Sequence, residues 1–201
     1  MSRDRRLVAG SKKLSWLLRH GASEAGLAMD AAGWATCDDV LRLTALSVDE
    51  LEEVVLRNNK SRFQLDGDRI RASQGHSLLG MPVTREALEA SWTVYESGPT
   101  VVHGTTVEAA ESIAVEGIKP GGRTHVHLAA TPDSVVGKRF HTPFLLKVSV
   151  ERVRSTGREV FVSPNGVVLI RDVPAACIVG LIAQSKSARR HEERLRRLLR
   201  L

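Results

Sequence analysis

The sequence predicts an α+β protein with two lobes, an N-terminal winged-helix-like lobe in residues 1–90 and a β-rich lobe in residues 91–201. Three observations predict this class. Helical apolar spacing with capping signals fills the first part, an alternating pattern around an Asp-Gly turn predicts one hairpin, and strand-like runs dominate from Thr100 onward. The 201 residues, 42% of them hydrophobic, suffice for one large or two small domains.

Local signals predict three helices and a two-stranded wing in the first lobe. Ser11 is expected to cap a helix over KKLSWLLRH that ends at Gly21, with an apolar side made of Leu14, Trp16, Leu17 and Leu18. Asp38 or Asp39 is expected to cap VLRLTAL, and Ser47 with Glu50 predicts a capping box before VDELEEVVLRN. Alternation from Arg62 to Ala72, around Asp66-Gly67, predicts the hairpin.

The second lobe is expected to be mostly strands. Its apolar runs are TVVHGT, HVHLAA, PFLLKVSV, EVFV, GVVLI and CIVGLIA. One amphipathic helix is predicted from Val107 to Glu116, and Thr131 with Asp133 predicts a short helix toward Gly137. Residues 187–201 form a basic amphipathic segment with Leu195, Leu198 and Leu199 on one face, which either docks or stays mobile.

Composition and charge exclude several classes. No apolar run approaches the roughly 18 residues of a transmembrane helix, and the basic N-terminal segment lacks an apolar signal core, so a cytoplasmic protein is expected. Cys37 and Cys177 have no CxxC spacing and are expected to be core residues, with neither a disulfide framework nor structural zinc. Residues 1–21 and 186–201 each carry a net charge of +5, which suits contact with polyanions or a solvated face.

Cations and polar groups recur where local pattern does not require them. Arg19-His20 at a helix end either complements the helix dipole or forms an anion site. Alternation places Lys60 and Arg62 on one strand face opposite Phe63, as a phosphate clamp or a charged strand edge.

Further candidates follow. The turn that carries Gln74, His76 and Ser77 either lines a groove between the lobes or is ordinary turn chemistry. His103 is expected to end a strand, with Gly104 permitting close approach of a ligand before Thr105.

Alternation also puts Arg123, His125 and His127 on one face of a strand. No metal is expected there, because neither a cysteine pair nor a carboxylate cluster accompanies them. Lys138-Arg139 forms a cation pair, and common nucleotide-binding motifs are absent from the sequence.

Taken in order, eight motifs resemble those of the RNA 2'-phosphotransferases that use NAD+. They are KKLSWLLRHG, DAAGW, NNKSRFQL, IRASQGHS, HGT, IKPGGRTHVHL, VGKRF and NGVVLIRDVP, and they span residues 11 to about 180. Two positions depart from the family pattern: Val168 stands where Trp is common, and Ala129 where Ser is usual.

The resemblance implies an enzyme with a winged-helix-like RNA lobe and an ADP-ribosyltransferase-like lobe that binds NAD. The enzyme transfers an internal RNA 2'-phosphate to NAD+ through a 2'-phospho-ADP-ribosylated RNA intermediate. The products are 2'-hydroxyl RNA, nicotinamide and ADP-ribose 1'',2''-cyclic phosphate, and no metal is required. The resemblance also implies a role in tRNA splicing or RNA repair, and a monomer is expected.

Site residues carry over by motif. The implied catalytic set is Arg19, His20, Arg62 and Arg123, and the implied 2'-phosphate contacts are Arg19, His20, Lys60 and Arg62. The implied NAD contacts are His103, Gly104, Thr105, His127 and Arg139. Two alternatives stay open: an ADP-ribosyltransferase that modifies terminal phosphates of nucleic acids, and a non-enzymatic winged-helix module that binds nucleic acid.

Overall fold

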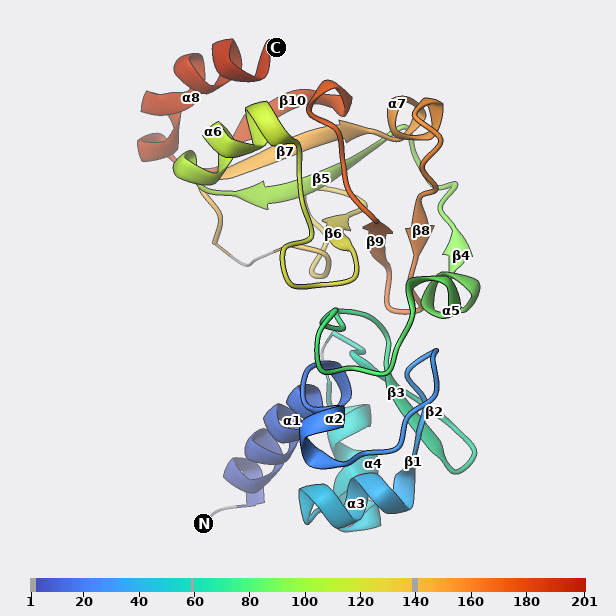
Figure 1. The fold of residues 1–201 in the computed structure, drawn as a ribbon. Coiled ribbons are helices and arrows are strands. Elements are labelled where there is room, and N and C mark those ends of the chain that lie inside the picture. Colours follow the sequence, from blue (N-terminus) through green and yellow to red (C-terminus); the bar gives the residue numbers. More distant parts are fainter. Residues whose placement is uncertain (1–2, 59, 139–140) are drawn as a thin grey trace. The chain divides into compact units, whose positions relative to one another are not determined.

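The computed structural model describes residues 3–58, 60–138 and 141–201, and it shows helices together with two antiparallel sheets (Figure 1). The mixed α and β class predicted from the sequence is confirmed at this level. The chain divides into two compact units. The first unit runs to Trp92 and also includes Gly122–Thr124, and the second contains Thr93–Gly121 and His125–Leu201. Each unit has its own hydrophobic core.

The first unit surrounds a small sheet with helices. Its elements are α1 (Arg3–Arg19), α2 (Ala22–Ala25), β1 (Ala35–Thr36), α3 (Cys37–Thr44), α4 (Val48–Leu56), β2 (Phe63–Asp66), β3 (Arg69–Ala72) and α5 (Arg85–Ala90). The predicted hairpin is confirmed, with Phe63 opposite Ala72 and Asp66 opposite Arg69. The structure adds β1 on the other side of β3, which gives the order β1-β3-β2 instead of a two-stranded wing.

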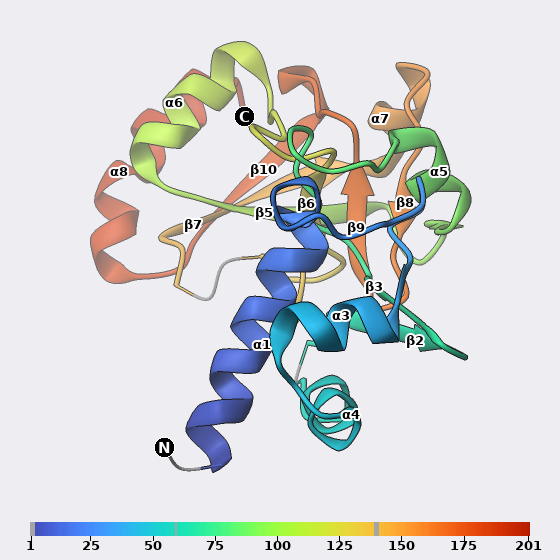
Figure 2. The same cartoon turned by 60° about the horizontal axis from the view of Figure 1, so that its bottom comes forward.

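Helix α1 begins earlier than predicted. It starts at Arg3, so Ser11 lies inside the helix and does not cap it. Leu7 is buried on the same face as Leu14, one heptad away, and its burial extends the buried stripe toward the N-terminus. Trp16 does not join that stripe, because its side chain is 39% exposed. Figure 2 shows α1 together with α3 and α4, both of which contact it.

Capping residues define the starts of the next two helices. The cap of α3 is Thr36, whose hydroxyl accepts a hydrogen bond from the Asp39 amide at 3.2 Å, so the predicted cap at Asp38 or Asp39 is wrong. The capping box of α4 is confirmed, since Ser47 and Glu50 each accept a hydrogen bond from the other's backbone amide.

The second unit is built on a seven-stranded antiparallel sheet of order β10-β7-β5-β6-β9-β8-β4. Its elements are β4 (Thr93–Val94), β5 (Thr100–Thr105), α6 (Val107–Glu116), β6 (Val126–Ala129), β7 (Phe144–Ser149), α7 (Val150–Ser155), β8 (Phe161–Val162), β9 (Val167–Ile170), η1 (Ala175–Cys177), β10 (Ile178–Ala183) and α8 (Lys186–Leu199). The predicted bounds of α6 are confirmed. Val168 lies in the predicted strand GVVLI and is fully buried in the core of this unit.

Helix α8 is docked, which resolves the choice left open by the sequence. Ala188, Leu195 and Leu199 are buried in the same core as Ala110 and Ile113 of α6. Both views show α8 beside α6 (Figures 1 and 2), and α8 also contacts β10. Leu198 does not share this face and is 45% exposed.

Two further predictions in this unit are wrong. His103 does not end a strand, because β5 continues through Thr105 in pairing with β7. The described residues from Thr131 to Lys138 form turns in place of the predicted short helix. The Thr131 amide there donates to the Ser134 hydroxyl at 3.0 Å, so the side chain closes a turn that does not propagate. No helix in the described ranges has the length and apolar character needed to span a membrane.

Candidate active site

Arg19 is the last residue of α1, and the chain wraps around its guanidinium. The helix closes there because the amides of His20 and Gly21 both donate to the Trp16 carbonyl, at 2.8 and 3.0 Å. Gly75 has a φ of +95° and lies against the guanidinium, since a Cβ at this position would be 3.5 Å from Arg19 Nε. Among the described residues, Arg19 Nε and Nη2 are buried without a hydrogen-bond partner. Such donors favour an anionic ligand that can accept from both of them.

The electrostatics show that other arginines lie near Arg19. The pKa of Arg19 is lowered to about 10, first by burial and then by the positive charges of Arg62 and Arg123. The group still carries its charge at neutral pH. Arg62 and Arg123 both repel Arg19, and a polyvalent anion that binds beside Arg19 offsets this repulsion.

His20 follows directly and is held by Ser77. Its Nδ1 lies 2.8 Å from Ser77 Oγ, and the Ser77 amide donates to the Arg19 carbonyl at 2.8 Å. The pKa of His20 is lowered by burial first, and then by Arg123 and Arg19. Because the ordinary value is about 6.5, the imidazole is mainly neutral at pH 7. It can therefore accept a proton.

Arg123 reaches this cluster on a short segment from a distant part of the sequence. Gly122–Thr124 belongs to the first unit, and Arg123 forms an antiparallel bridge with Ser77. Three hydrogen bonds hold the segment: Leu78 N to Gly122 O at 3.0 Å, Thr124 N to His76 O at 3.0 Å, and Arg85 Nε to Thr124 O at 3.0 Å. The backbone is fixed while the Arg123 side chain is exposed.

The predicted shared face of Arg123, His125 and His127 is wrong. Strand β6 begins only at Val126, so alternation does not extend back to Arg123. His125 is buried in the second unit, whereas Arg123 is exposed in the first. The chain passes from one unit to the other between these residues.

Lys60 and Arg62 lie in a turn that precedes β2, so the predicted strand alternation over these two residues is also wrong. Asn58 Oδ1 accepts from the amides of both Lys60 and Arg62 at 3.2 Å, and Ser61 has a φ of +43°. Ser73 anchors the turn, because its amide donates to the Arg62 carbonyl at 2.8 Å. This turn places Arg62 where its charge acts on Arg19.

The DAAGW motif has a structural explanation. Asp30 Oδ1 accepts from the amides of Ala32 and Trp34, both at 2.9 Å, which closes a tight turn. The buried Arg71 guanidinium lies 4.5 Å from the ring centroid of Trp34. A Cβ at Gly33 would be 3.0 Å from His76 Nε2, so this turn packs on the buried His76, the residue before Ser77.

The second unit carries the residues expected to contact NAD. His103 Nδ1 is 3.1 Å from the His127 carbonyl oxygen, and because a carbonyl only accepts, the proton lies on Nδ1. Gly104 follows on β5, and a Cβ there would be 2.8 Å from Thr142 Oγ1, so the close approach that glycine permits is made by Thr142. Thr105 is buried. Arg139 lies outside the described residues.

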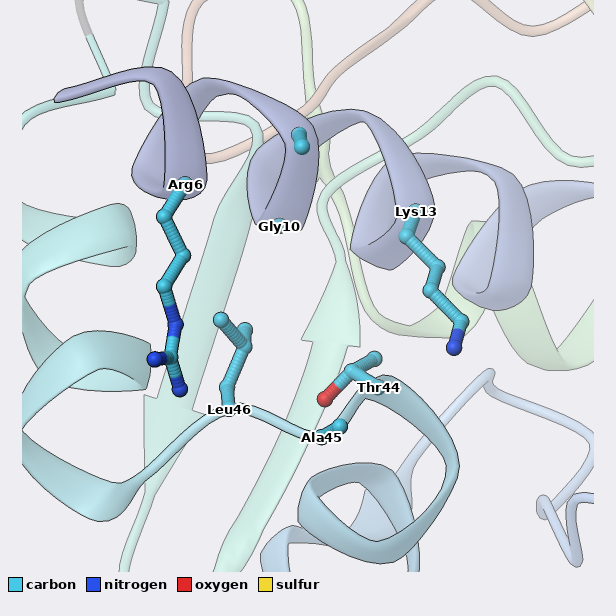
Figure 3. Close-up of a pocket in the computed structure, with 7 residues that line it drawn as sticks. Arg6, Gly10, Lys13, Thr44, Ala45 and Leu46 are labelled. Atoms are coloured by element: carbon cyan, nitrogen blue, oxygen red, sulfur yellow. The ribbon is translucent and has the colours of Figure 1, made fainter. Parts of the chain in front are cut away.

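A cavity of about 510 Å³ lies elsewhere in the first unit and does not include any predicted site residue. Figure 3 shows Arg6 and Lys13 extending from α1 on either side of Gly10, toward Thr44 and Leu46. Arg6 is ion-paired with Glu50 at 2.8 Å, and the Thr44 hydroxyl donates to the Val40 carbonyl at 2.7 Å. These polar groups are satisfied within the fold.

The described histidines do not form a metal site with other ligating side chains. Over residues 3–58, 60–138 and 141–201, no three or more histidine, cysteine, aspartate or glutamate side chains are grouped so that they could hold a metal ion.

Comparison with known proteins shows which family the chain matches. Residues 5–172 match the model of the RNA 2'-phosphotransferase, Tpt1 / KptA family. Three relatives carry the name probable RNA 2'-phosphotransferase. They come from Burkholderia lata (40% identical over 176 residues, covering 82% of this chain and 86% of the relative), Pseudomonas savastanoi pv. phaseolicola (38% over 172 residues, 81% and 88%) and Acaryochloris marina (34% over 185 residues, 88% and 98%).

These matches show that the chain is a transferase. It belongs to the RNA 2'-phosphotransferase family. The resemblance inferred from the eight motifs is thereby confirmed.

Two features of the site escaped sequence reasoning. The contact between Ser77 and His20 joins residues 57 positions apart, and the motif IRASQGHS marked Ser77 as unusual without naming its partner. The assignment of Gly122–Thr124 to the first unit has no local signal in the sequence.

Proposed function

We propose that this protein removes an internal 2'-phosphate from RNA by transferring it to NAD+ as co-substrate, in two steps. In the first, an oxygen of the RNA 2'-phosphate forms a bond to the nicotinamide ribose C1'', and the bond to nicotinamide breaks with its electron pair. In the second, the ribose O2'' attacks phosphorus and expels the RNA 2'-oxygen, which takes up a proton. The products are 2'-hydroxyl RNA, nicotinamide and ADP-ribose 1'',2''-cyclic phosphate.

The observation that carries this proposal is Arg19, which has two buried, unpartnered nitrogens and a pKa lowered first by burial and then by Arg62 and Arg123. A phosphate dianion beside a pyrophosphate must be held against its own repulsion, and permanently charged guanidinium groups do this with forked hydrogen bonds. We assign Arg19, His20, Lys60 and Arg62 to the 2'-phosphate.

The second step develops charge on the nonbridging phosphate oxygens. Arg62 and Arg123 are assigned to this charge, because cations fixed in advance lower the barrier without reorganisation. Loss of one such contact costs about 3 kcal/mol in the barrier, or about a hundredfold in rate.

His20 is assigned to the proton of the second step. Its lowered pKa keeps the imidazole neutral, and Ser77 fixes the ring, so it can accept the proton from the ribose O2'' and return it to the RNA 2'-oxygen. Ser77 is a positioning residue in this scheme.

The second unit is proposed as the ADP-ribosyltransferase-like, NAD-binding lobe and the first as the winged-helix-like RNA lobe. His103, Gly104 and Thr105 on β5, together with His127 on β6 and Arg139, are the proposed NAD contacts. In support of this role, the His103 imidazole on β5 is hydrogen-bonded to the His127 carbonyl on β6, so the two strands bring these two residues together. Ala129 is fully buried in β6 and supplies no hydroxyl at the position where serine is usual in the family.

The test incubates the protein with NAD+ and a short RNA bearing one internal 2'-phosphate, in the presence of a chelator, and resolves both products. We expect 2'-hydroxyl RNA and the cyclic phosphate. Arg62→Ala and Arg123→Ala are expected to accumulate the ADP-ribosylated RNA, because they weaken the second step more than the first.

Two outcomes would replace the proposal. Stable ADP-ribosylated RNA from the unmodified protein indicates an ADP-ribosyltransferase that stops after the first step. Intact NAD+ with bound RNA indicates a binding module. We also propose that the protein is a cytoplasmic monomer that acts on spliced tRNA or in RNA repair.

A further inference from the structure

Helix α8 lies beyond residue 172, where the family match ends, and its cations fall into two groups. One group docks the helix. Arg194 is ion-paired with Glu111 of α6, and Arg196 donates to the Leu181 carbonyl at 3.0 Å and to Glu192. These contacts add to the burial of Leu195 and Leu199 and fix the helix on the second unit.

The other group forms an exposed basic face made of Lys186, Arg189, Arg190 and Arg197. Each residue of an α-helix turns about 100°, so these four positions share one side, roughly opposite the buried Ala188 and Leu195. Glu193 is the acidic residue on this side, and it is ion-paired with Arg197. Glu193 also lies four residues after Arg189 and three after Arg190, so one carboxylate faces three arginines and the side keeps a net positive charge.

The placement of these cations does not serve the helix itself. The first turn of α8 contains no acidic residue, although the partial positive charge at a helix N-terminus disfavours cations there. Three exposed cations within five residues also repel one another. A polyanion outside the protein relieves both effects, because it neutralises the cations and releases counterions.

We propose that the basic face of α8 binds the phosphate backbone of the RNA substrate at nucleotides away from the 2'-phosphate. This inference rests on the proposed function for the identity of the substrate. An anionic membrane is the less suitable partner, because a surface helix inserts its apolar face and that face of α8 is already buried.

The test compares the unmodified protein with the triple variant Lys186→Gln, Arg189→Gln, Arg190→Gln. The substrates are a dinucleotide and a 20-nucleotide RNA, each carrying one 2'-phosphate. We expect KM for the long RNA to rise about tenfold at low salt with kcat unchanged, and no change for the dinucleotide. Fluorescence anisotropy is expected to show a salt dependence of long-RNA binding reduced by about 2 in log–log slope, near 0.7 for each lost phosphate contact.

The charge-conserving variant Lys186→Arg, Arg189→Lys, Arg190→Lys is the matched control and is expected to behave like the unmodified protein. Equal anisotropy and equal KM for the glutamine and control variants on the long RNA would overturn the inference while leaving the proposed function intact. Absence of cyclic phosphate from the unmodified protein would overturn the function, and anisotropy would still test the surface. Binding to anionic vesicles in place of RNA would also refute the inference.

Discussion

The guanidinium of Arg19 is costly to the free protein. Two of its nitrogens are buried without a partner among the described residues, and neighbouring positive charges lower its pKa to about 10. Burying an unsatisfied charge opposes folding, so this residue is not explained by stability. The same features preorganise a phosphate site, because the cost of stripping water from the cation is met before the ligand arrives.

His20 allows a direct test of this electrostatic description. In the free protein, burial and the charges of Arg123 and Arg19 all favour the neutral imidazole, so we expect NMR titration of His20 to give a midpoint below 6.5. Inorganic phosphate is expected to raise that midpoint, because a bound anion stabilises the imidazolium. Arg123→Gln is expected to raise it in the free protein, since one repelling charge is removed.

Lys12→Gln on the exposed side of α1 serves as the control and is expected to leave the midpoint unchanged. A midpoint at or above 6.5 in the free, unmodified protein would show that the arginines do not act on His20 as described.

The end of α1 depends on Gly21 and Trp16. A Cβ at Gly21 would lie 2.3 Å from Trp16 Cζ2, so the indole covers this glycine closely. The φ of Gly21 is −115°, so the backbone itself tolerates other residues and the restriction comes from the indole. We expect Gly21→Ala to lower the free energy of unfolding by about 1–3 kcal/mol, measured with urea, because the indole or the helix end must move.

A double variant separates this contact from other causes. Adding Trp16→Leu to Gly21→Ala is expected to recover much of the loss, since the smaller side chain leaves room for the methyl group. Gly122→Ala is the matched control, because a Cβ there has no neighbour within 4 Å. Equal losses in the single and double variants would rule out the indole as the cause.

The predictability of each element follows from how local its signal is. The capping box at Ser47 and Glu50 was predictable because both partners lie within one helical turn. The start of α1 was not, because Ser11 has a capping side chain but the residues before it are also compatible with a helix. Strand β1 has two residues, too few to display alternation. The turn before β2 was misassigned because the Asn58 side chain replaces the strand hydrogen bonds there.

The candidate site was predictable as a list of residue types and not as an arrangement. The motifs supplied Arg19, His20, Arg62 and Arg123, but their proximity depends on backbone hydrogen bonds between residues far apart in sequence. The bridge between Ser77 and Arg123 is one such contact. Composition and periodicity carry no information on such pairings.

At the scale of the whole molecule, the tryptophans report on one unit. Trp16, Trp34 and Trp92 all belong to the first unit, so their fluorescence follows that unit, whereas circular dichroism follows both. The two units have separate hydrophobic cores, so each is expected to unfold in its own transition. We expect phosphate to raise the urea midpoint of the first unit, which is measured by tryptophan fluorescence. The midpoint of the second unit, which is measured by circular dichroism, is expected to stay unchanged. At 100 times its Kd, phosphate adds about 2.7 kcal/mol.

Arg19→Met is the variant for this measurement. Without phosphate, its first unit is expected to be at least as stable as that of the unmodified protein, because a buried charge is replaced by an apolar chain of similar length. With phosphate, its midpoint is expected to stay constant. An equal phosphate shift in both proteins would place the anion elsewhere.

The segment Gly122–Thr124 constrains how this gene can be rearranged. A recombination breakpoint at residue 92 would exchange most of the first unit but leave Arg123 with the other parent. The hybrid would then pair the Ser77 segment of one ancestor with the Gly122–Thr124 segment of another, at the bridge between Ser77 and Arg123. Inheritance of the two units as interchangeable modules is therefore disfavoured, and a viable chimera must carry residues 122–124 together with the first 92.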